Sequence, residues 1–492
     1  MAETGKANVR PRSALTPPAT LRIFPGRMLF PTAKFLAFFA VAFAVYWLLG
    51  RHRWRLVWLT AASAFFYACW RWEFLFLILA STGLDYLVAL KLVKVHSPRA
   101  RRALVAFSVS INLGILAYFK YAAFLLDSAT EVTHWLGWSV PIPTVKAFLP
   151  LGISFYTFEA ISYIVDVYRG TTKPVRNPLD YAVYILFFPH LVAGPIVRPN
   201  EFLPQLERPK RFDWPRFQAG AQLFLIGLFK KSVIADQLAL AIDPVFKTPG
   251  EYGSAALWLA VLGYAVQIYC DFSGYTDMAL GLAHTLGFKL PNNFNAPYLA
   301  SSPADFWRRW HISLSRWLRD YLYIPLGGNR HGPVRTMVNL FVTMLLGGLW
   351  HGANWTFVVW GAYHGVLLAI QRVIPRSWAM PALRPATTLL TFLLVCVGWV
   401  FFRAQTLGEA GTILKGLVVP TRGSELAGDG ALLVMVCVIA TLVGQAVGQM
   451  KGAPRLVFRV PAPVVGAAMA TILALALTLT PGEGKAFIYF QF

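Results

Sequence analysis

The sequence predicts an all-α, polytopic membrane protein built as a bundle of transmembrane helices. Of its 492 residues, 57% are hydrophobic and only 14% are charged, and the mean hydropathy is +0.54, so the charges are too few to cover a soluble surface of this size. Apolar runs near the ~20 residues that cross a hydrocarbon core recur from end to end, without the period-2 alternation of a barrel. We therefore expect about ten to thirteen helical spans, together with re-entrant or interfacial helices.

The expected elements leave no room for a separate soluble domain, so residues 28–492 form one membrane domain. Residues 1–27 are basic and predict a disordered tail. The run 28–50 is too long for the apolar part of a signal peptide and lacks a small-residue cleavage site, so we expect a retained span. The run 56–70 is short for a crossing, whereas 254–288 is long enough to bend. The other expected spans or half-spans cover residues 74–90, 103–126, 150–167, 179–197, 217–243, 336–350, 353–373, 385–402, 430–449 and 462–480.

The formal charge of +23 first suggests a nucleic acid as partner, but the cations form short clusters at the ends of apolar runs. Anionic lipid headgroups fit this distribution better, at roughly 1 kcal/mol per basic residue near the surface, and we expect no nucleic-acid binding. Basic clusters flank the first span on both sides, so the positive-inside rule leaves the orientation of the N-terminus open. Four single cysteines without CxxC spacing predict packing residues, namely Cys69, Cys270, Cys396 and Cys437.

Residues 291–335 interrupt the apolar pattern with interleaved tryptophans and arginines. On a continuous helix Trp307, Trp310 and Trp317 would lie near one face, with arginines offset from it by about a third of a turn. One interpretation is an interfacial helix whose tryptophans lie at headgroup level. The alternative is a re-entrant element that lines a protein-walled cavity, where charge and irregular backbone are tolerated.

Two histidines are the strongest candidates for chemistry. His351 lies between two long apolar stretches, where an ionisable residue indicates a functional site by default, and His311 lies within the tryptophan and arginine segment. We interpret them as one buried reaction centre. A histidine suits general-base work because its unperturbed pKa of about 6.5 leaves it largely neutral and able to take a proton from a hydroxyl. The glycines around His351, at 347, 348 and 352, serve either close helix packing or the approach of a substrate.

The other titratable residues in apolar context have structural explanations. We expect structural histidines with satisfied hydrogen bonds at His190, His284 and His364, and structural ion pairs at Asp271 and Asp277. The partner expected for Asp271 is an arginine of 308–319, and the alternative for Asp271 is the orientation of a histidine. There is no HExxH and no third ligand at useful spacing, so we expect no bound metal. The sequence also lacks GxGxxG after a strand, the Walker A motif and GxSxG, which argues against dinucleotide, nucleotide and serine-hydrolase chemistry.

Four distinctive segments follow one another in the second half of the chain. They are Asp-Phe-Ser-Gly-Tyr-Thr-Asp at 271–277, Phe-Trp-Arg-Arg-Trp-His-Ile-Ser-Leu-Ser-Arg-Trp at 306–317, Tyr-Leu-Tyr-Ile-Pro-Leu-Gly-Gly-Asn-Arg at 321–330 and Gly-Gly-Leu-Trp-His-Gly at 347–352, with support at 151–158, 166–169, 192–196, 398–404 and 487–492. In this fixed order they resemble the membrane-bound O-acyltransferase family, and most of all its bacterial alginate O-acetylation branch. The resemblance extends over roughly residues 28–492.

The resemblance implies a ring of helices around a central tunnel, which donor and acceptor enter from opposite faces of a bacterial inner membrane. It implies that His351 is the catalytic base and that His311 occupies the family's second polar position. The donor would be acetyl-CoA or another acyl thioester, with no cofactor bound, and the acceptor an exported polysaccharide or a periplasmic relay protein. The residues expected to line the substrate path are Asp271, Tyr275, Trp307, Arg308, Trp310, Ser315, Arg316, Trp350 and Asn354.

Three alternative functions stay open on the sequence. Transfer of D-alanine or of a lipid acyl chain would keep His351 and change the tunnel width and the acceptor. A polysaccharide or lipid transporter would need inverted repeats and broken helices at the midplane, neither of which the sequence shows. A membrane scaffold would tolerate His351→Ala.

Overall fold

The fold is an all-α membrane bundle, as the sequence predicts. The computed structural model describes residues 28–138, 141–143, 145, 148–192, 194–374, 381–450, 461–479 and 488. In these ranges the regular secondary structure is helical apart from one isolated bridge between Tyr252 and Ser424, and turns and loops connect the helices. The tail expected at 1–27 and nearly all of the 487–492 motif lie outside the described residues.

The first part of the chain forms long helices followed by a group of short ones. Side-chain oxygens of Thr32 and Ser97 accept backbone N–H groups and so cap the first turns of α1 and α4. The elements are α1 (Ala33–Leu48), α2 (His52–Arg71), α3 (Glu73–Leu92), α4 (Pro98–Leu116), the π-helical turn η1 (Ala117–Tyr121), α5 (Ala122–Trp135), α6 (Ile153–Arg169), α7 (Pro178–Leu186), α8 (Phe188–Leu191) and α9 (Pro199–Leu206).

The second part has the longest helix, α12, and a series of short segments that precede α15. These elements are α10 (Trp214–Leu228), the π-helical η2 (Phe229–Ala235), α11 (Asp236–Lys247), η3 (Pro249–Glu251), α12 (Ser254–Thr285), η4 (Pro297–Leu299), α13 (Pro303–Arg309), α14 (Ile312–Leu318), the π-helical η5 (Arg319–Tyr323), α15 (Gly332–His351), α16 (Trp355–Val373), η7 (Pro381–Leu383), α17 (Arg384–Arg403), α18 (Leu407–Val418), α19 (Gly428–Gly448) and α21 (Ala462–Leu479).

In the described ranges, six helical stretches are long and apolar enough to cross a membrane by length and composition. They are Glu73–Leu92, Pro98–Trp135, Ser254–Thr285, Gly332–His351, Arg384–Arg403 and Gly428–Gly448. Other expected spans are shorter, more polar or broken. The run expected at 179–197, for example, is divided at Phe187 into α7 and the four-residue α8, most of whose residues are buried. A backbone break at membrane depth is tolerated when protein surrounds it, so this run is a half-span.

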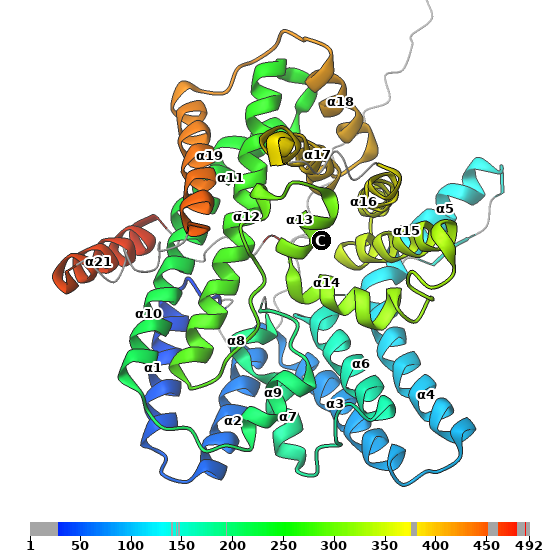
Figure 1. Cartoon of the computed structure of the whole chain (residues 1–492), viewed down its shortest axis with the longest axis vertical. Helices are drawn as coiled ribbons and strands as arrows, with labels where there is room; N and C mark the ends of the chain where they lie inside the picture. Colours follow the sequence, from blue (N-terminus) through cyan, green and yellow to red (C-terminus); the bar gives the residue numbers. More distant parts are fainter. Residues whose placement is uncertain are drawn as a thin grey trace, which may run out of the picture.

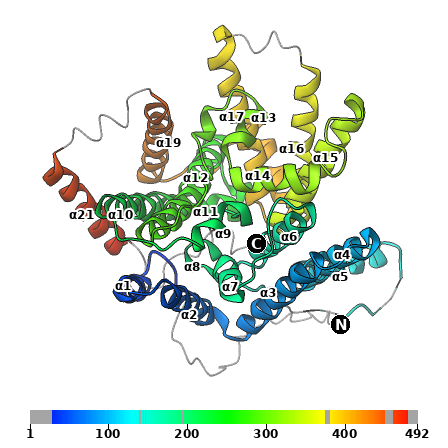
Figure 2. The same cartoon turned by 60° about the horizontal axis from the view of Figure 1, so that its bottom comes forward.

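Glycine contacts bring the central helices unusually close together. A Cβ added to Gly227 of α10 would lie 2.4 Å from the Gly274 carbonyl of α12, and one added to Gly281 would lie 2.5 Å from the Gly220 carbonyl. Backbones this close leave no space for a larger residue. Figure 1 shows α13 and α14 between α12 on one side and α15 and α16 on the other, and Figure 2 shows α8, α9 and α14 surrounded by longer helices.

The tryptophan and arginine segment is a broken, buried element. The helix stops after Arg309 and restarts at Ile312, with Trp310 extended and His311 left-handed at φ +43°. Trp307, Trp310 and Trp317 are only 8%, 1% and 7% exposed. Tryptophans at headgroup level would be far more exposed, so the structure favours the re-entrant interpretation over the interfacial one.

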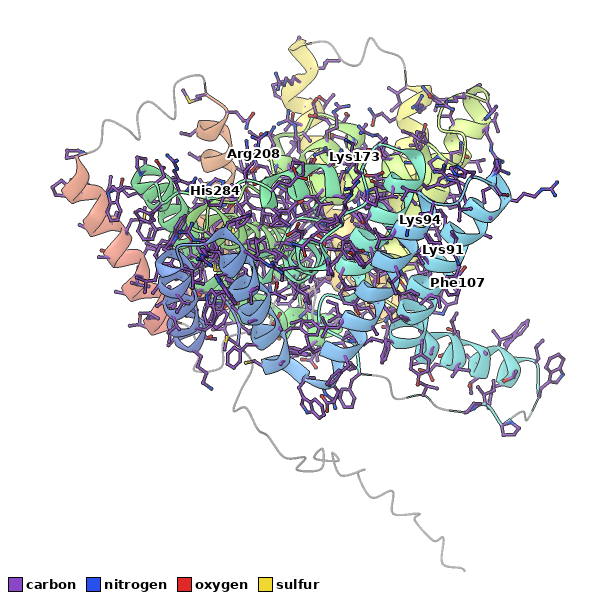
Figure 3. All side chains as sticks on the ribbon, turned by 90° about the horizontal axis from the view of Figure 1, so that it is seen from below. Lys91, Lys94, Phe107, Lys173, Arg208 and His284 are labelled. Carbon is purple, nitrogen blue, oxygen red and sulfur yellow. The ribbon has the colours of Figure 1, made fainter. Side chains whose placement is uncertain are left out.

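The ends of α3, α6 and α9 and the loops that follow them carry cations on one side of the bundle, which we name the basic end. Figure 3 views the molecule from this side and labels four of these cations, Lys91, Lys94, Lys173 and Arg208. The start of α2 belongs to the same end, because Arg55 donates a hydrogen bond of 2.7 Å to the Lys210 carbonyl. Because α1 ends at Leu48, just before α2 starts, Ala33 lies toward the opposite end.

Candidate active site

His351 is the last residue of α15 and lies in an aromatic enclosure. Its side chain is 4% exposed, and its ring centroid lies 5.0 Å from those of Trp350 and Trp360 and 5.3 Å from that of Phe402. The helix stops there because Gly352 turns to an extended backbone, with φ −157°. The imidazole is therefore fixed at a helix end in an apolar environment, as the sequence predicts.

His311 reaches the same enclosure from the break between α13 and α14. It is fully buried, and its ring lies edge-on against Phe272 with a centroid distance of 4.6 Å. Asn293 holds the break, because its carbonyl accepts from Ile312 N–H at 3.0 Å and its side-chain oxygen accepts from the N–H and hydroxyl of Ser313 at 3.1 and 2.7 Å. A long-range contact thus fixes the left-handed backbone of His311.

The structure brings the two histidines together, although forty residues separate them in the chain. Their ring centroids are 6.3 Å apart, and the Trp350 ring lies 6.0 Å from His311. This spacing leaves one imidazole able to accept a proton while the other hydrogen-bonds a reacting group beside it. No group of three or more His, Cys, Asp or Glu side chains within metal-binding distance occurs in the described part of the chain.

Among the other predicted site residues, three tryptophans lie beside the histidines. Trp350 contacts both imidazoles, and Trp307 packs against Trp360 with a centroid distance of 5.7 Å. Trp310 precedes His311 and stacks within the aromatic core, with its centroid 4.9 Å from Trp399. These residues shape the walls of the enclosure.

The remaining predicted residues have partners elsewhere. Arg308 is exposed and pairs with Asp305 at 3.3 Å, and Arg316 pairs with Glu201 at 2.7 Å. The Ser315 hydroxyl donates to the Trp310 carbonyl at 3.3 Å, and the Asn354 side chain caps α16 by accepting from Thr356 N–H at 2.9 Å. Their role in lining the substrate path remains a prediction.

Asp271 and Tyr275 belong to a buried ionic cluster on α12 and η2. The ion pair predicted for Asp271 is present, but its partner is Lys231, not an arginine of 308–319. Lys231 also pairs with Asp236 at 2.7 Å, and its ammonium lies 5.7 Å from the Tyr275 ring centroid. The alternative in which Asp271 orients a histidine was therefore wrong, and the predicted ion pair of Asp277 is made by the neighbouring Lys230, at 2.6 Å.

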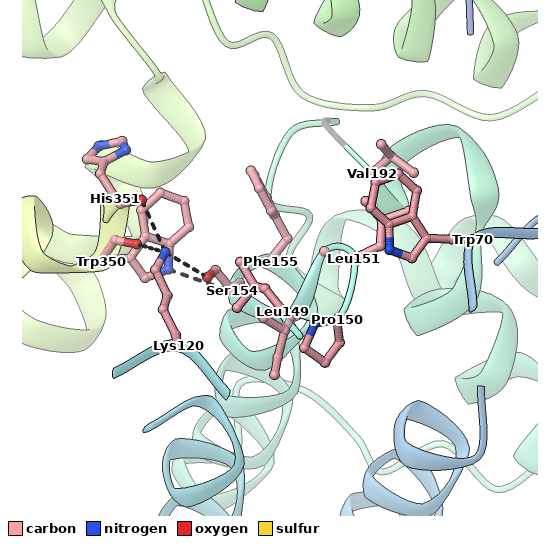
Figure 4. A pocket seen from close by; sticks show the side chains of 12 residues that line it. Trp70, Lys120, Leu149, Pro150, Leu151, Ser154, Phe155, Val192, Trp350 and His351 are labelled. Carbon is pink, nitrogen blue, oxygen red and sulfur yellow. Dashed lines mark hydrogen bonds between the residues drawn. The ribbon is translucent and has the colours of Figure 1, made fainter. Parts of the chain in front are cut away.

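A small cavity of about 70 Å³ reaches His351 from the side of α6 (Figure 4). One wall is Trp70, which lies near the end of α2 that faces away from the basic end. The cavity is lined by Trp70, Lys120, Leu149, Pro150, Leu151, Gly152, Ile153, Ser154, Phe155, Val192, Trp350 and His351. Lys120 was missed by the sequence analysis, although a lone lysine inside an apolar run was itself a signal of function.

Comparison with known proteins identifies the chain. Residues 175–407, which include both histidines, match the profile of the membrane-bound O-acyltransferase family. The chain is 46% identical to a probable alginate O-acetylase of Pseudomonas aeruginosa over 392 residues, which are 79% of this chain and 75% of that protein. The chain belongs to the membrane-bound O-acyltransferase family. It is therefore an O-acyltransferase and a multi-pass membrane protein.

Other relatives carry different acceptors in their names. A peptidoglycan O-acetyltransferase of Helicobacter pylori is 38% identical over 434 residues, which are 81% of each chain. A teichoic acid D-alanyltransferase of Bacillus subtilis is 30% identical over 279 residues, which are 52% of this chain and 69% of that protein. The broken helices α7–α8 and α13–α14, which sequence analysis did not show, thus belong to an acyltransferase and not to a transporter.

The glycines near His351 of this acyltransferase serve close packing. A Cβ on Gly348 would lie 2.3 Å from the Phe357 carbonyl of α16, and one on Gly352 would lie 2.2 Å from the Phe357 ring. Gly347 faces Leu318 of α14, whose Cδ1 would be 3.2 Å from an added Cβ. These contacts support close helix packing over the approach of a substrate as the role of the glycines. They hold the end of α15 between α14 and α16.

Proposed function

We propose that this membrane O-acyltransferase moves an acetyl group from a cytoplasmic acyl thioester to a hydroxyl of an exported polysaccharide or of a periplasmic relay protein. Two relatives support acetyl as the transferred group, since both are named for acetyl transfer to a cell-surface carbohydrate, and each alignment covers about four fifths of this chain. The D-alanyl relative aligns with only about half of it. The observation that carries the proposal is the buried pair of imidazoles, His311 and His351, whose ring centroids are 6.3 Å apart; His351 also lines the cavity beside α6.

In the proposed mechanism His351 is the general base. Its imidazole takes the proton of the acceptor hydroxyl as the hydroxyl oxygen attacks the thioester carbonyl carbon. The tetrahedral adduct then breaks its C–S bond, and the thiolate leaves with the proton that the imidazolium returns. His311 is placed to hydrogen-bond the carbonyl oxygen, whose negative charge grows in the transition state. No covalent enzyme intermediate and no bound cofactor or metal is needed.

The charge distribution supports the proposed direction of transfer. Positively charged loop residues remain on the cytoplasmic side, so we assign the basic end to the cytoplasm of a bacterial inner membrane. Ala33, at the start of α1, then lies toward the periplasmic side, which gives the orientation that the sequence left open. An anionic donor such as acetyl-CoA would be attracted to the basic end, while the cavity beside Trp70 faces the acceptor side.

The test of this proposal compares the exported polysaccharides of a deletion strain with those of the same strain carrying the wild-type gene. Alkali releases both acetate and alanine from their esters, so one hydrolysate distinguishes the two acyl groups. We expect ester-linked acetate to disappear in the deletion strain and to return on complementation. If ester-linked D-alanine is lost while acetate is unchanged, the transferred group is D-alanyl and not acetyl. No change in either would overturn the polysaccharide as final acceptor.

A further inference from the structure

The π-helical turn η1 brings two polar side chains to the end of the helix that carries His351. It occupies residues 117–121 within the continuous helical stretch Pro98–Trp135. A π-helical turn inserts an extra residue into a helix and is frequent at functional sites. Here it presents Lys120 and Tyr121 to the C-terminal end of α15.

Lys120 and Tyr121 bind three successive carbonyl groups at that end. The Lys120 ammonium donates to the carbonyls of Trp350 and of His351, the latter at 3.1 Å, and the Tyr121 hydroxyl donates to the Leu349 carbonyl at 2.9 Å (Figure 4 shows the lysine contacts). The last four carbonyls of an α-helix have no partner within the helix. Two side chains of one π-helical turn therefore satisfy three of the four, and the positive charge complements the negative end of the helix dipole.

The third ammonium proton joins this end to α6. Lys120 donates to the Ser154 hydroxyl at 3.3 Å, and the Trp350 indole N–H donates to the Ser154 carbonyl at 3.4 Å. An ammonium group has three N–H donors. All three have protein acceptors, so Lys120 borders the cavity without a donor left for substrate.

We propose that Lys120 is a positioning residue, which fixes the backbone of His351 against α6 and so orients the imidazole for proton transfer. The inference rests on the proposed role of His351 as the base. Mispositioning of a reacting group by about 1 Å can cost ~100-fold in rate. Lys120 thus acts on the reaction through the end of α15.

The test uses the full-length protein in the deletion strain, with ester-linked acetate on the exported polysaccharide as readout. Lys120→Met removes the charge and the three donors while keeping an unbranched side chain of similar length. We expect ester formation to fall by ~100-fold, in line with the loss for a misplaced catalytic group. Lys120→Arg retains a cation with donors and should recover at least about tenfold over Lys120→Met. Lys415→Met, at an exposed position on α18 that belongs neither to the site nor to the basic end, is the matched control and should leave ester formation unchanged.

Two further measurements separate positioning from a role in folding and from the proposed function itself. The detergent-solubilised Lys120→Met protein should keep the membrane level and the melting temperature of the wild type within a few degrees. A large fall in either, without recovery by Lys120→Arg, would make Lys120 a folding residue and overturn the proposal. His351→Ala is assayed in parallel. Loss of ester in His351→Ala with full ester in Lys120→Met would overturn the positioning role of Lys120 and leave the proposed function standing. Full ester in His351→Ala would overturn both the proposed function and the positioning role of Lys120.

Discussion

The left-handed backbone of His311 allows its imidazole to be tested separately from its conformation. His311 and Ala296 are the two residues other than glycine at positive φ in the described part of the chain, at +43° and +45°. Replacing His311 with alanine removes the imidazole and keeps a Cβ in this strained region. Replacing it with glycine removes the imidazole and relieves the strain as well. Both variants therefore lack the imidazole, and they differ from each other in backbone strain and so in stability.

The size of the difference follows from the backbone. A left-handed conformation costs an L-residue about 1–2 kcal/mol. Glycine recovers this and loses about 0.5–1 kcal/mol in chain entropy on folding. We expect His311→Gly to be more stable than His311→Ala by about 1 kcal/mol. Both variants should lose ester formation by ~100-fold or more, within the range for removing a hydrogen-bond donor to a developing oxyanion.

The assay combines the melting temperature of each purified variant in detergent with the ester level in the complemented deletion strain. Ala296→Gly is the matched control, because it relieves the same kind of strain away from the imidazoles. It should raise the melting temperature and leave the ester level unchanged. Ester formation at the wild-type level in His311→Gly would show that the imidazole takes no part in the reaction. A His311→Gly protein no more stable than His311→Ala would refute the argument from backbone strain.

Two other substitutions test the packing and the ionic cluster. Gly348→Ala should abolish ester formation and lower the protein level in the membrane, because its Cβ would lie 2.3 Å from the Phe357 carbonyl. The control is Gly83→Ala, whose Cβ would meet nothing within 4 Å; it should change neither the ester level nor the protein level. Lys231→Met should lower the free energy of unfolding by about 3–5 kcal/mol, because the carboxylates of Asp236 and Asp271 would lose their buried cation. The melting temperature is compared with that of the exposed Lys94→Met control, and equal values for the two variants would contradict this prediction.

Sequence analysis predicted the long helices and the proximity of the two histidines. The run expected at 254–288 is helix Ser254–Thr285, and the run expected at 336–350 lies within Gly332–His351. Apolar runs of this length have few alternatives in a membrane, which is why they are easy to recognise. The proximity of His311 and His351 was inferred from their unusual settings alone, and the structure places their rings 6.3 Å apart.

The break at His311 could not be read from the local sequence. No glycine or proline lies at residues 310 and 311, and the tryptophan spacing fits one continuous helix. The break depends on hydrogen bonds from Ile312 and Ser313 to Asn293, which lies about twenty residues earlier in the same segment, and the helical pattern around 310 and 311 does not show them. Lys120 and Lys231 were missed for a related reason. Each lies on a π-helical turn within an apolar run that predicts a span, and its partners lie on other helices.

The most direct test of the central claim is the ester-linked acetate of exported polysaccharide in cells that carry His351→Ala, beside wild type, the deletion strain and the exposed-lysine control Lys415→Met. We expect the His351→Ala level to equal that of the deletion strain, with the protein present in the membrane at its normal amount and Lys415→Met at the wild-type level. Ester at the wild-type level in His351→Ala, with loss only in the deletion strain, would contradict the assignment of His351 as the catalytic base.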